Sequence, residues 1–583
     1  MPLILLHPDK MKKALSAPAS VGIELFVLAG VAALFAGLIL IGEQVSAPLT
    51  ASETLDPSLW QLPKYTAFTL LRGLAAYVLS LVFTLVYGII AGHSRRAEKI
   101  MLPVLDILQS LPVLIFLPGL QILFGRLFPT RQLGLELACV ITIFTAQAWN
   151  MCFSFFGSVR GIPTTLREVT AIQHLNSWQV FRLLEVPASM IGLVWNSMMS
   201  MAGGWFFIAL SEDFGDHKLP GLGSYMSVAQ KAGNTKGQIG AVIAMVIMIV
   251  ALDQFIWRPI VAWSERFKLE DVSAAEAPKS WVMNLIHRSR LIGWIEKMLL
   301  GWRSRQKQRQ TSVPAAAGAR SGALISVLIQ VLKWLALAAL TMGLAWGSWA
   351  LFELLRGVPL VSPSHEDWRY IVLALLASFG RVAATIVIGA AWTLPAGVLI
   401  GLHPRWAQRL QPVVQVVASF PATMLFPWVV IGLKLMHIPF TIGCISLLLL
   451  GTQWYVLFNV IAGAMAIPSD LREAAKVYRL GRWFTWRKLY IPAVFPYLVT
   501  GLVTAAGGAW NATIVAEYFN LSDPPTETFG LGAIISKASL TDPKNGPMLA
   551  AGGITMAVFV VIFNRLLWKK LYRVAEQRYS LNV

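Results

Sequence analysis

The chain has 583 residues, of which 56% are hydrophobic and 13% are charged. A surface so poor in charge excludes a soluble globular protein, and hydrophobic stretches of about 20 residues or more have the length of helices that cross a bilayer. The formal net charge of +19 comes from cations in short loops between these stretches, which is typical of positively charged cytoplasmic loops and argues against nucleic acid as a partner. Strand-type alternation is absent, so we expect an all-α polytopic membrane protein.

The first half contains six hydrophobic segments of membrane-spanning length. They cover residues 21–41, 67–92, 101–124, 134–156, 187–210 and 238–257. Three lysines precede the first segment, which is too long for the core of a signal peptide and is not followed by a small-residue cleavage site. We therefore expect it to be retained as the first transmembrane helix.

A basic segment, residues 267–323, separates the two halves. Its stretch 281–302 mixes apolar and aromatic residues with Lys and Arg, which predicts an amphipathic helix on the anionic inner leaflet. A plain tether explains the same composition, and both interpretations stay open.

The second half contains six further segments. They cover residues 325–352, 371–401, 412–435, 440–461, 492–516 and 547–568. Arg95 and Arg96 follow the second segment of the chain, whereas residues 45–62 contain no Lys or Arg. The distribution of cations predicts about 12 transmembrane helices with both termini in the cytoplasm.

The two halves repeat each other in sequence. At an offset of 309 residues, Arg72, Gly88, Gly92, Pro103, Ser110, Pro112 and Pro118 match Arg381, Gly397, Gly401, Pro412, Ser419, Pro421 and Pro427. At an offset of 305, residues 162–168 match 467–473, and Trp205 and Glu212 match Trp510 and Glu517. Because each half has an even number of spans, both copies face the same way, and the sequence predicts parallel units at 1–266 and 324–583.

The string shared by both halves lies on the predicted cytoplasmic side and has a helical pattern of its own. Thr165 and Asp470 stand three residues before Glu168 and Glu473, a spacing that predicts capping boxes at helix starts.

Two residues that accept a left-handed conformation follow these helices. Asn176 and Gly481 stand eight residues after the glutamates, and a second helical stretch then runs to the next span. Soluble helical segments at 162–187 and 467–492, on one membrane face, predict a docking surface for a partner. An ordinary connecting loop is the alternative.

The second of these segments resembles a known motif. Glu473-Ala474-Ala475, with Pro492 nineteen residues after the glutamate, is similar to the EAA loop of ABC importer permeases, which docks on the ATPase. Together with the Pro-rich third span and the Gly-Leu-Gly string after Glu212, the chain resembles the nitrate/sulfonate/taurine/bicarbonate group of these importers. The first copy departs from the motif, with Val169 and Thr170 after its glutamate.

The resemblance implies a fold, partners and a location. The fold is two parallel six-helix type I ABC importer permease repeats in the bacterial cytoplasmic (inner) membrane. The partners are an ABC ATPase dimer, which holds ATP and Mg, and a periplasmic or lipid-anchored solute-binding protein; this chain itself binds no cofactor or metal. His174 and Arg479 stand where the family has Gly, six residues after the glutamate. The residues implied in ATPase coupling are Leu166, Arg167, Glu168, His174, Leu471, Arg472, Glu473, Ala474, Ala475 and Gly481.

Family membership also implies a pathway lined by the third and fifth spans of both units. A proline within a span frees backbone carbonyls and bends the helix, which is tolerated where protein or a water-filled cavity satisfies them. The candidate lining residues are Ser110, Pro112, Ser419 and Pro421.

Two arginines near the outer ends of their spans are further pathway candidates. Arg72 and Arg381 are costly there unless they are paired or face water, and they are suited to attract an anionic solute. Snorkelling to the interface or pairing with a carboxylate is the alternative. Glu212 and Glu517 are expected to be structural partners or contacts of the binding protein.

No catalytic constellation is visible in the sequence. It contains no nucleophile with a base, no metal cluster and no phosphate-binding Gly loop, so ATP must be hydrolysed by another chain. We expect the permease subunit of an ATP-driven importer for a small solute, such as the anions nitrate, sulfonate or bicarbonate; small neutral heterocycles stay open as solutes. An ion-gradient-driven secondary transporter is the alternative, for which inverted repeats or mid-membrane carboxylates would be expected. A membrane enzyme is a second alternative, and no residue pattern favours it.

Overall fold

The computed structural model describes residues 55–214, 218–267, 321–362, 367–519, 525–540 and 545–579, with a few isolated positions besides. The predicted first span, 21–41, and nearly all of the linker 267–323 lie outside the described residues, so neither interpretation of the linker is tested. The chain forms two compact units, one of Met1–Ala36 with Lys279–Pro359 and one of Gly37–Pro278 with Leu360–Val583.

The smaller unit contains one long described helix, α15 (Ser321–Arg356). It covers the predicted seventh span and has 36 residues. Its exposed large side chains, including Trp346 and Trp349, are apolar, as expected of a helix surrounded by lipid.

The larger unit is built from apolar helices. Among the described residues, eight helices, some of them continued by short helical turns, are long and apolar enough to cross a membrane. Four come from each half: α3 (Leu62–His93), α6 (Leu133–Arg160), α9 (Val186–Asp213) and α11 (Thr235–Leu252), then α16 (Trp368–Leu402), α19 (Phe440–Met465), α22 (Ile491–Ala516) and α24 (Gly546–Phe563). The all-α polytopic prediction is confirmed.

The predicted third and ninth spans are broken rather than continuous. Each consists of two helices, α4 (Arg95–Ser110) with α5 (Phe116–Leu127), and α17 (Pro404–Ser419) with α18 (Phe426–Leu435), and the broken spans bend by 78° and 81°. The breaks fall at Pro112 and Pro421, which precede the short 3₁₀ turns η2 (Val113–Ile115) and η6 (Ala422–Leu425). Proline lacks the N–H that a continuous helix needs and disfavours helical backbone in the residue before it.

Shorter elements complete the larger unit, and all but η1 and η5 recur in the same order in both halves. They are η1 (Leu59–Gln61), α7 (Thr164–Ile172), α8 (Ser177–Val180), η3 (Phe181–Glu185), α10 (Leu222–Lys231), η4 (Asp253–Trp257), α12 (Arg258–Ser264), η5 (Glu265–Phe267), α20 (Ser469–Val477), α21 (Arg482–Thr485), η7 (Trp486–Tyr490), α23 (Leu531–Leu540), η8 (Asn564–Trp568) and α25 (Lys569–Tyr579). The second half also has a short antiparallel pair, β1 (Tyr518–Phe519) with β2 (Thr526–Glu527).

Glycines matched between the two halves allow the second and fourth spans of each half to pack closely. A Cβ at Gly88 on α3 would lie 2.4 Å from the ring of Phe155 on α6. Its counterpart Gly397 on α16 would place a Cβ 2.6 Å from Val460 on α19. Small residues let helix backbones approach in the membrane, so the same packing requirement explains the glycine at both positions.

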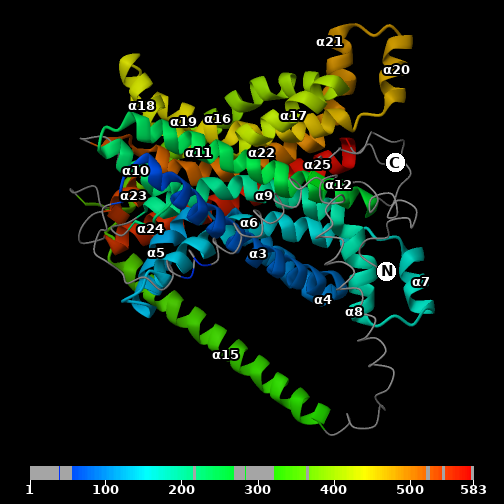
Figure 1. Ribbon diagram of the computed structural model, residues 1–583, viewed down its shortest axis with the longest axis horizontal. Helices are drawn as coiled ribbons and strands as arrows, with labels where there is room; N and C mark the ends of the chain where they lie inside the picture. Colours follow the sequence, from blue (N-terminus) through cyan, green and yellow to red (C-terminus); the bar gives the residue numbers. More distant parts are fainter. Residues whose placement is uncertain are drawn as a thin grey trace, which may run out of the picture. The chain divides into compact units, whose positions relative to one another are not determined.

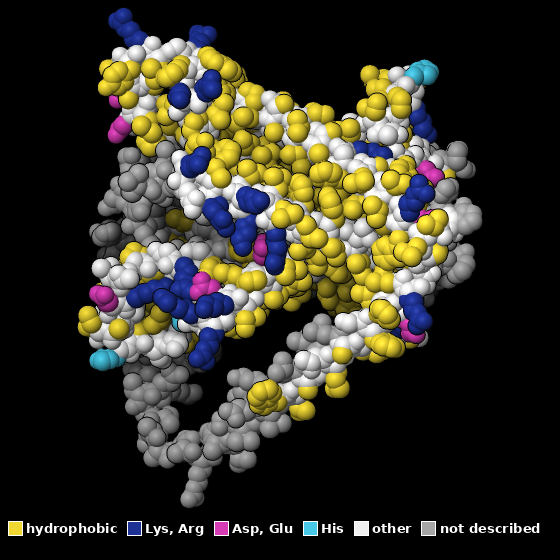
Figure 2. Space-filling model, turned by 180° about the vertical axis from the view of Figure 1, so that it is seen from behind, with side chains coloured by type: hydrophobic (Ala, Val, Ile, Leu, Met, Phe, Trp, Pro, Cys, Tyr) yellow, Lys and Arg dark blue, Asp and Glu magenta, His cyan; other side chains and the backbone are white. Residues whose placement is uncertain are grey.

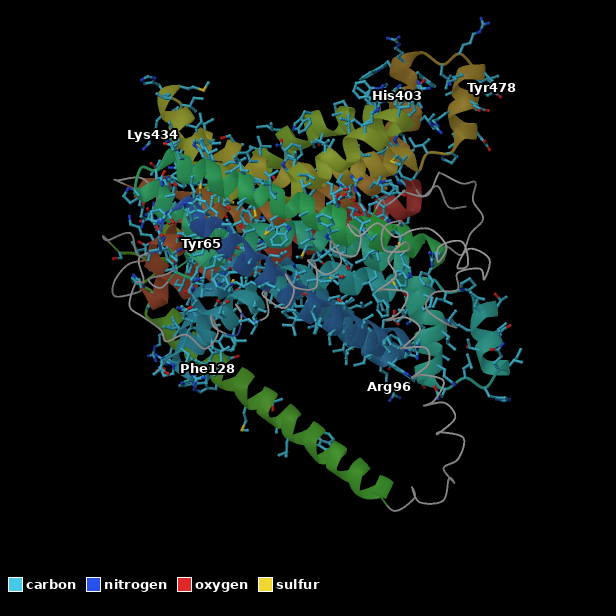
Figure 3. All side chains as sticks on the ribbon, in the orientation of Figure 1. Tyr65, Arg96, Phe128, His403, Lys434 and Tyr478 are labelled. Atoms are coloured by element: carbon cyan, nitrogen blue, oxygen red, sulfur yellow. The ribbon has the colours of Figure 1, made fainter. Side chains whose placement is uncertain are left out.

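The ends of the larger unit differ in charge and in the elements they carry. The helix pairs α7/α8 and α20/α21 project from one end (Figure 1). Arg96, His403 and Tyr478 lie toward this end, whereas Phe128 and Lys434 lie toward the other (Figure 3). Figure 2 shows a broad apolar band, with Lys and Arg gathered toward the end that carries the helix pairs. By the positive-inside rule, this concentration of cations predicts that the end is cytoplasmic, and the helix pairs of both halves lie at it.

Candidate functional site

Two helical hairpins form the first part of the site. We call them the coupling hairpins, after the role that the sequence predicts for them. They consist of residues 164–185 (α7, α8, η3) and 469–490 (α20, α21, η7). Their first helices begin directly after Pro163 and Pro468, which occupy the N-cap positions. The predicted capping boxes are therefore wrong, because Thr165 and Asp470 already lie inside the first turn, where a side chain does not act as the N-cap.

The turn within each hairpin uses the left-handed region at a position that the sequence interpretation missed. His174 has φ 50° and Arg479 has φ 48°. The next backbone N–H closes the turn by donating five residues back, from Leu175 to the Thr170 carbonyl at 3.1 Å and from Leu480 to the Ala475 carbonyl at 3.0 Å. This is the Schellman pattern. His174 and Arg479 thus occupy the left-handed position where the family has Gly.

The predicted left-handed residues have another role. Asn176 has φ −73° and Gly481 has φ −58°, so neither is left-handed, and each precedes the second helix of its hairpin as the N-cap residue. The Asn176 side chain accepts from the Gln179 N–H at 2.8 Å, and the Gln179 side chain accepts from the Asn176 N–H at 2.9 Å. The capping box of the first hairpin therefore lies at its second helix.

Both coupling hairpins expose large apolar side chains. Ile172 and Trp178 of the first are 76% and 65% exposed, and Tyr478 and Trp483 of the second are each 77% exposed. An exposed apolar cluster of this kind marks a surface that binds another protein or a membrane.

The predicted coupling residues are divided between this surface and the hairpin interior. Glu168, Glu473 and Leu471 are exposed, whereas Ala475 is buried. Leu166, Arg167, Arg472 and Ala474 are half-buried, and Arg167 donates to the Val159 carbonyl at 2.5 Å.

The two hairpins differ in charge. Residues 164–185 hold two cations, Arg167 and Arg182, against two carboxylates, Glu168 and Glu185. Residues 469–490 hold six cations against two carboxylates: Arg472, Lys476, Arg479, Arg482, Arg487 and Lys488 against Asp470 and Glu473. With histidine neutral, the first hairpin has no net charge and the second has +4.

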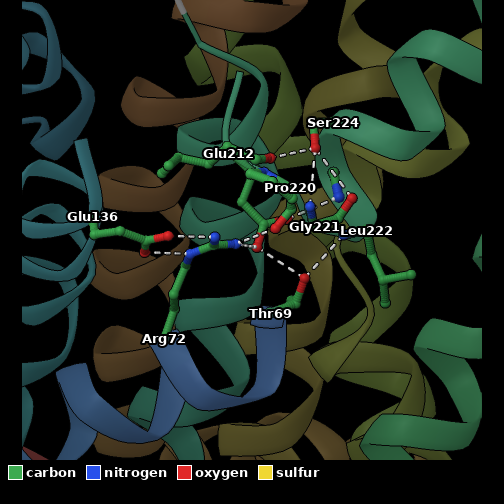
Figure 4. A network of polar contacts seen from close by, with 10 residues as sticks. Thr69, Arg72, Glu136, Glu212, Pro220, Gly221, Leu222 and Ser224 are labelled. Carbon is green, nitrogen blue, oxygen red and sulfur yellow. Dashed lines mark hydrogen bonds and ion pairs between the residues drawn. The ribbon is translucent and has the colours of Figure 1, made fainter. Parts of the chain in front are cut away.

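At the opposite end, Arg72 lies in a buried polar network (Figure 4). Its guanidinium donates two hydrogen bonds to Glu136, both at 2.6 Å, and one to Glu212 at 2.8 Å. A fourth goes to the Pro220 carbonyl at 2.7 Å. The arginine and Glu136 are 5% and 7% exposed and Glu212 is fully buried, so the network is shielded from solvent.

Arg381 occupies the equivalent network of the second half. It donates to Glu517 at 2.6 Å and to the Phe529 carbonyl at 2.6 Å. The place of Glu136 is taken by Thr441, 305 residues further on, whose carbonyl accepts from Arg381 at 3.3 Å. The second network therefore balances one cation with one carboxylate, whereas the first has one cation and two carboxylates.

Each network fixes a glycine turn, from which the short helix α10 or α23 begins. Glu212 accepts from the Gly223 N–H at 2.9 Å, and Glu517 accepts from the Gly532 N–H at 2.9 Å. A Cβ at Gly221 would lie within 2.3 Å of the Glu212 carboxyl atoms, which explains the glycine there. Each buried carboxylate thus accepts a backbone hydrogen bond from its Gly-Leu-Gly string and fixes the conformation of that turn.

Helix α10 is also hydrogen-bonded to the segment that precedes the second span, at Pro57. On α10, burial raises the pKa of Tyr225 above its ordinary value, so the hydroxyl stays protonated and donates to the Pro57 carbonyl at 2.8 Å.

The structure places the two predicted pathway arginines in these networks rather than at an open surface, which favours the pairing alternative; whether they act in transport stays a prediction. Glu212 and Glu517 are their structural partners. Glu136 was missed, although an acidic residue inside a hydrophobic segment was a usable signal.

The second part of the site is the seam, the surface where α9 of the first half meets α17, α19 and α22 of the second. Three small cavities follow it, with volumes of about 30, 10 and 30 Å³. Ala202 on α9 lines all three. A single water needs roughly 10–15 Å³, so each cavity has room for only a few waters and the seam is closed in this conformation.

Of the predicted lining residues, Ser419 lines one of these cavities. Pro112 and Pro421 lie at the breaks of the bent spans, and they line none of the three cavities. The side chain of Ser110 lies outside the described residues. Sequence reasoning missed most of the lining, because it comes from α9 and α19 side chains that carry no motif.

Parallel helical repeats, a helical hairpin duplicated at one end and a seam between the halves define a membrane permease built from two repeats. The chain belongs to the family of binding-protein-dependent transport system inner membrane components, which it matches over residues 84–255 and again over 393–568. The predicted internal repeat and the ABC importer permease family are thereby confirmed.

Three relatives are informative. The chain is 31% identical to the nitrate import permease protein NrtB of Leptolyngbya laminosa over 24% of this chain and 50% of the relative. It is 32% identical to the bicarbonate transport system permease protein CmpB of Synechocystis over 24% of this chain and 49% of the relative. The match thus spans about half the length of these relatives. The trimethylamine N-oxide transport system permease protein TmoV of Pelagibacter ubique is 22% identical over 85% of this chain and 69% of its own length.

Proposed function

We propose that this chain is the transmembrane subunit of an ATP-driven importer and that a small solute crosses the membrane at the seam. The observation that carries the proposal is the pair of coupling hairpins, which share one backbone geometry and expose Trp178 and Trp483 at the same end. A separate ABC ATPase dimer, which binds ATP and Mg, would dock there. A secondary transporter would have no use for two such docking hairpins.

Continuous helices connect the hairpins to the seam. The helical run that begins with α8 extends from Ser177 to Asp213, and the equivalent run extends from Arg482 to Ala516. Their α9 and α22 portions contribute Ala202 and Gly508 to the seam cavities. A displacement of the hairpins by the ATPase would therefore be transmitted directly to the pathway.

The outer end would receive the solute from a periplasmic or lipid-anchored binding protein. The outer helices α10 and α23 and the glycine turns held by Glu212 and Glu517 lie at this end, so they are the candidate contacts. In this arrangement the chain lies in the bacterial inner membrane with both termini in the cytoplasm, as the distribution of cations also predicts.

A small solute is supported by the relatives, whose names specify nitrate, bicarbonate and trimethylamine N-oxide. An anion was expected from the sequence, and the first two names favour it. Arg72 and Arg381, the residues that suggested an anion site, are instead bonded to buried carboxylates. Neither of these two described arginines is therefore free to bind an anion.

The test is transport in proteoliposomes that contain this chain together with its co-purified ATPase and binding protein. We expect uptake that requires ATP, and we expect Trp178→Asp with Trp483→Asp to abolish it. Trp406→Asp is the matched control, since Trp406 is 62% exposed on α17 and lies outside both hairpins. Solute exchange without ATP would overturn the proposal and favour a secondary transporter.

Topology gives an independent check. Cysteines at Ser94, Ser177 and Arg482 should react with a membrane-impermeant thiol reagent from the cytoplasmic side, and a cysteine at Ser58 from the outside. Labelling of Ser177 and Arg482 from opposite sides would contradict the parallel repeat.

A further inference from the structure

Tyr455 on α19 occupies a special position in the seam. A Cβ at Gly203 on α9 would lie 3.2 Å from the Tyr455 hydroxyl oxygen, and a Cβ at Gly508 on α22 would lie 3.3 Å from its ring. Gly203 and Gly508 are counterparts, 305 residues apart. The side chain therefore enters a slot between the fifth spans of the two halves, where both helices carry glycine at the point of closest approach.

Two polar groups in the seam have no hydrogen-bond partner among the described residues. The Tyr455 side chain lines two of the cavities, and its hydroxyl has no such partner. The Gln415 side chain lines two cavities, and its amide has no such partner either. A tyrosine hydroxyl in apolar surroundings normally finds a partner, so this pair of neutral groups is available to a bound molecule.

The rest of the lining is apolar and rich in aromatic rings. Large apolar side chains come from both halves: Trp195, Phe206, Phe207, Trp454 and Phe458. The described residues that line the three cavities include no Lys or Arg. They include one carboxylate, Asp253, which accepts from Arg258 at 3.0 Å.

This chemistry disfavours an anion in the seam. An anion that enters would lose its hydration, find no cation among the lining residues and approach the carboxylate of Asp253. Aromatic faces with a few neutral donors and acceptors are the usual setting for an organic ligand.

Resting on the proposed function, we propose that the seam around Tyr455 binds a small uncharged organic solute with a planar apolar face. The solute's face packs against the aromatic rings, and its polar group bonds to the Tyr455 hydroxyl and the Gln415 amide. The closed seam admits it when α9 and α22 move apart. Tyr455 is thus a specificity-determining residue of the pathway.

The test uses the complete complex of this chain with its ATPase and binding protein in lipid nanodiscs. Solute-stimulated ATP hydrolysis is measured with thymine as the uncharged planar probe, sodium nitrate as the anion and choline as the organic cation. We expect stimulation by thymine alone. Removing one neutral hydrogen bond in Tyr455→Phe should raise the half-maximal thymine concentration about 3- to 10-fold.

Tyr497→Phe is the matched control. Tyr497 lies on α22, outside the three cavities, with its ring 2.8 Å from the position of a Cβ at Gly463. The control should leave the thymine response unchanged. Stimulation by nitrate or choline, no stimulation by thymine, or equal effects of the two tyrosine variants would each overturn the inference. A complex that hydrolyses no ATP, or that takes up solute without it, would instead count against the proposed function.

Discussion

The two buried arginine networks share their geometry but not their charge. Arg72 and Arg381 each bind a carboxylate that in turn closes the glycine turn of an outer helix. Only Arg72 has a second carboxylate, Glu136, where the other half has Thr441. The duplicated units therefore retain the hydrogen bonds that fix the backbone, whereas the charge balance around them has diverged.

The coupling hairpins likewise share their backbone geometry but differ in net charge. Their turns have nearly the same left-handed angle, φ 50° at His174 and φ 48° at Arg479. Their net charges, by contrast, are zero and +4. The backbone of a hairpin must fit a partner of fixed shape, whereas its charge is free to adapt to one particular partner surface. For the proposed ATPase dimer, the comparison predicts unequal contacts with the two halves.

We expect the largest effect on stability from replacing the two buried arginines. Arg72→Gln leaves two buried carboxylates without their cation, and Arg381→Gln leaves one. Removing one partner of a buried ion pair costs about 3–5 kcal/mol, so both variants should be strongly destabilised and Arg72→Gln the more so. The measurement is thermal unfolding of the purified complex, with Lys434→Gln, in the exposed last turn of α18, as the control. Equal losses would show that Glu136 is already neutral.

The two carboxylates of the first network should differ in the same experiment. Glu212 accepts from Thr69, Arg72 and the Gly223 N–H, whereas among the described residues Glu136 accepts from Arg72 alone. We expect Glu212→Gln to cost about 2–3 kcal/mol and Glu136→Gln about 1 kcal/mol, because hydrogen bonds to charged groups are lost in unequal number. A greater loss at Glu136 would show that it, and not Glu212, is the main partner of Arg72.

We expect a smaller effect from replacing the equivalent glutamates of the two coupling hairpins. Ala474 is half-buried and leaves a low helix surface after Glu473, whereas its counterpart Val169 after Glu168 is bulkier and 47% exposed. We expect Glu473→Ala to uncouple ATP hydrolysis from uptake more than Glu168→Ala, by about fivefold, which corresponds to about 1 kcal/mol. Co-purification of the ATPase is the control for assembly. Equal defects would mean that the partner surface compensates for the wider first helix.

The smallest effect tests the feature that the hairpins share. Glycine adopts the left-handed region without the strain that other residues carry there, so His174→Gly and Arg479→Gly should each stabilise a hairpin by up to about 1 kcal/mol. Slower hydrogen exchange of the hairpin amides would report this. His403→Gly is the control, since His403 has φ −110° and gains nothing from the change. A different response of the two turns would contradict their common geometry.

The sequence was sufficient for the features that depend on local pattern or on repetition. Within the described part of the chain, the predicted segments correspond to helices, Pro112 and Pro421 correspond to the breaks, and the matched glycines correspond to close helix contacts. The capping and turn residues were misplaced because each hairpin helix begins two residues earlier than the motif suggests, and the left-handed position lies two residues earlier as well, at His174 and Arg479. Motif spacing alone does not fix that start.

Sequence reasoning missed two important residues for different reasons. Glu136 has no acidic counterpart in the second half, so a comparison of the halves passes over it. Tyr455 has a role only because α19 brings it between Gly203 and Gly508, which are about 250 and 50 residues away along the chain. Such a meeting of distant segments depends on tertiary packing, which periodicity does not report.

The π-helical turns η3 and η7 end the coupling hairpins and continue directly into α9 and α22. A π turn holds one residue more than an α turn, and one residue corresponds to about 100° of rotation. These two insertions therefore set the rotational phase of α9 and α22 relative to the hairpins that would drive them. Deleting a single residue from either turn would restore regular α geometry and point a different face of the same helix, and a different set of side chains, into the seam.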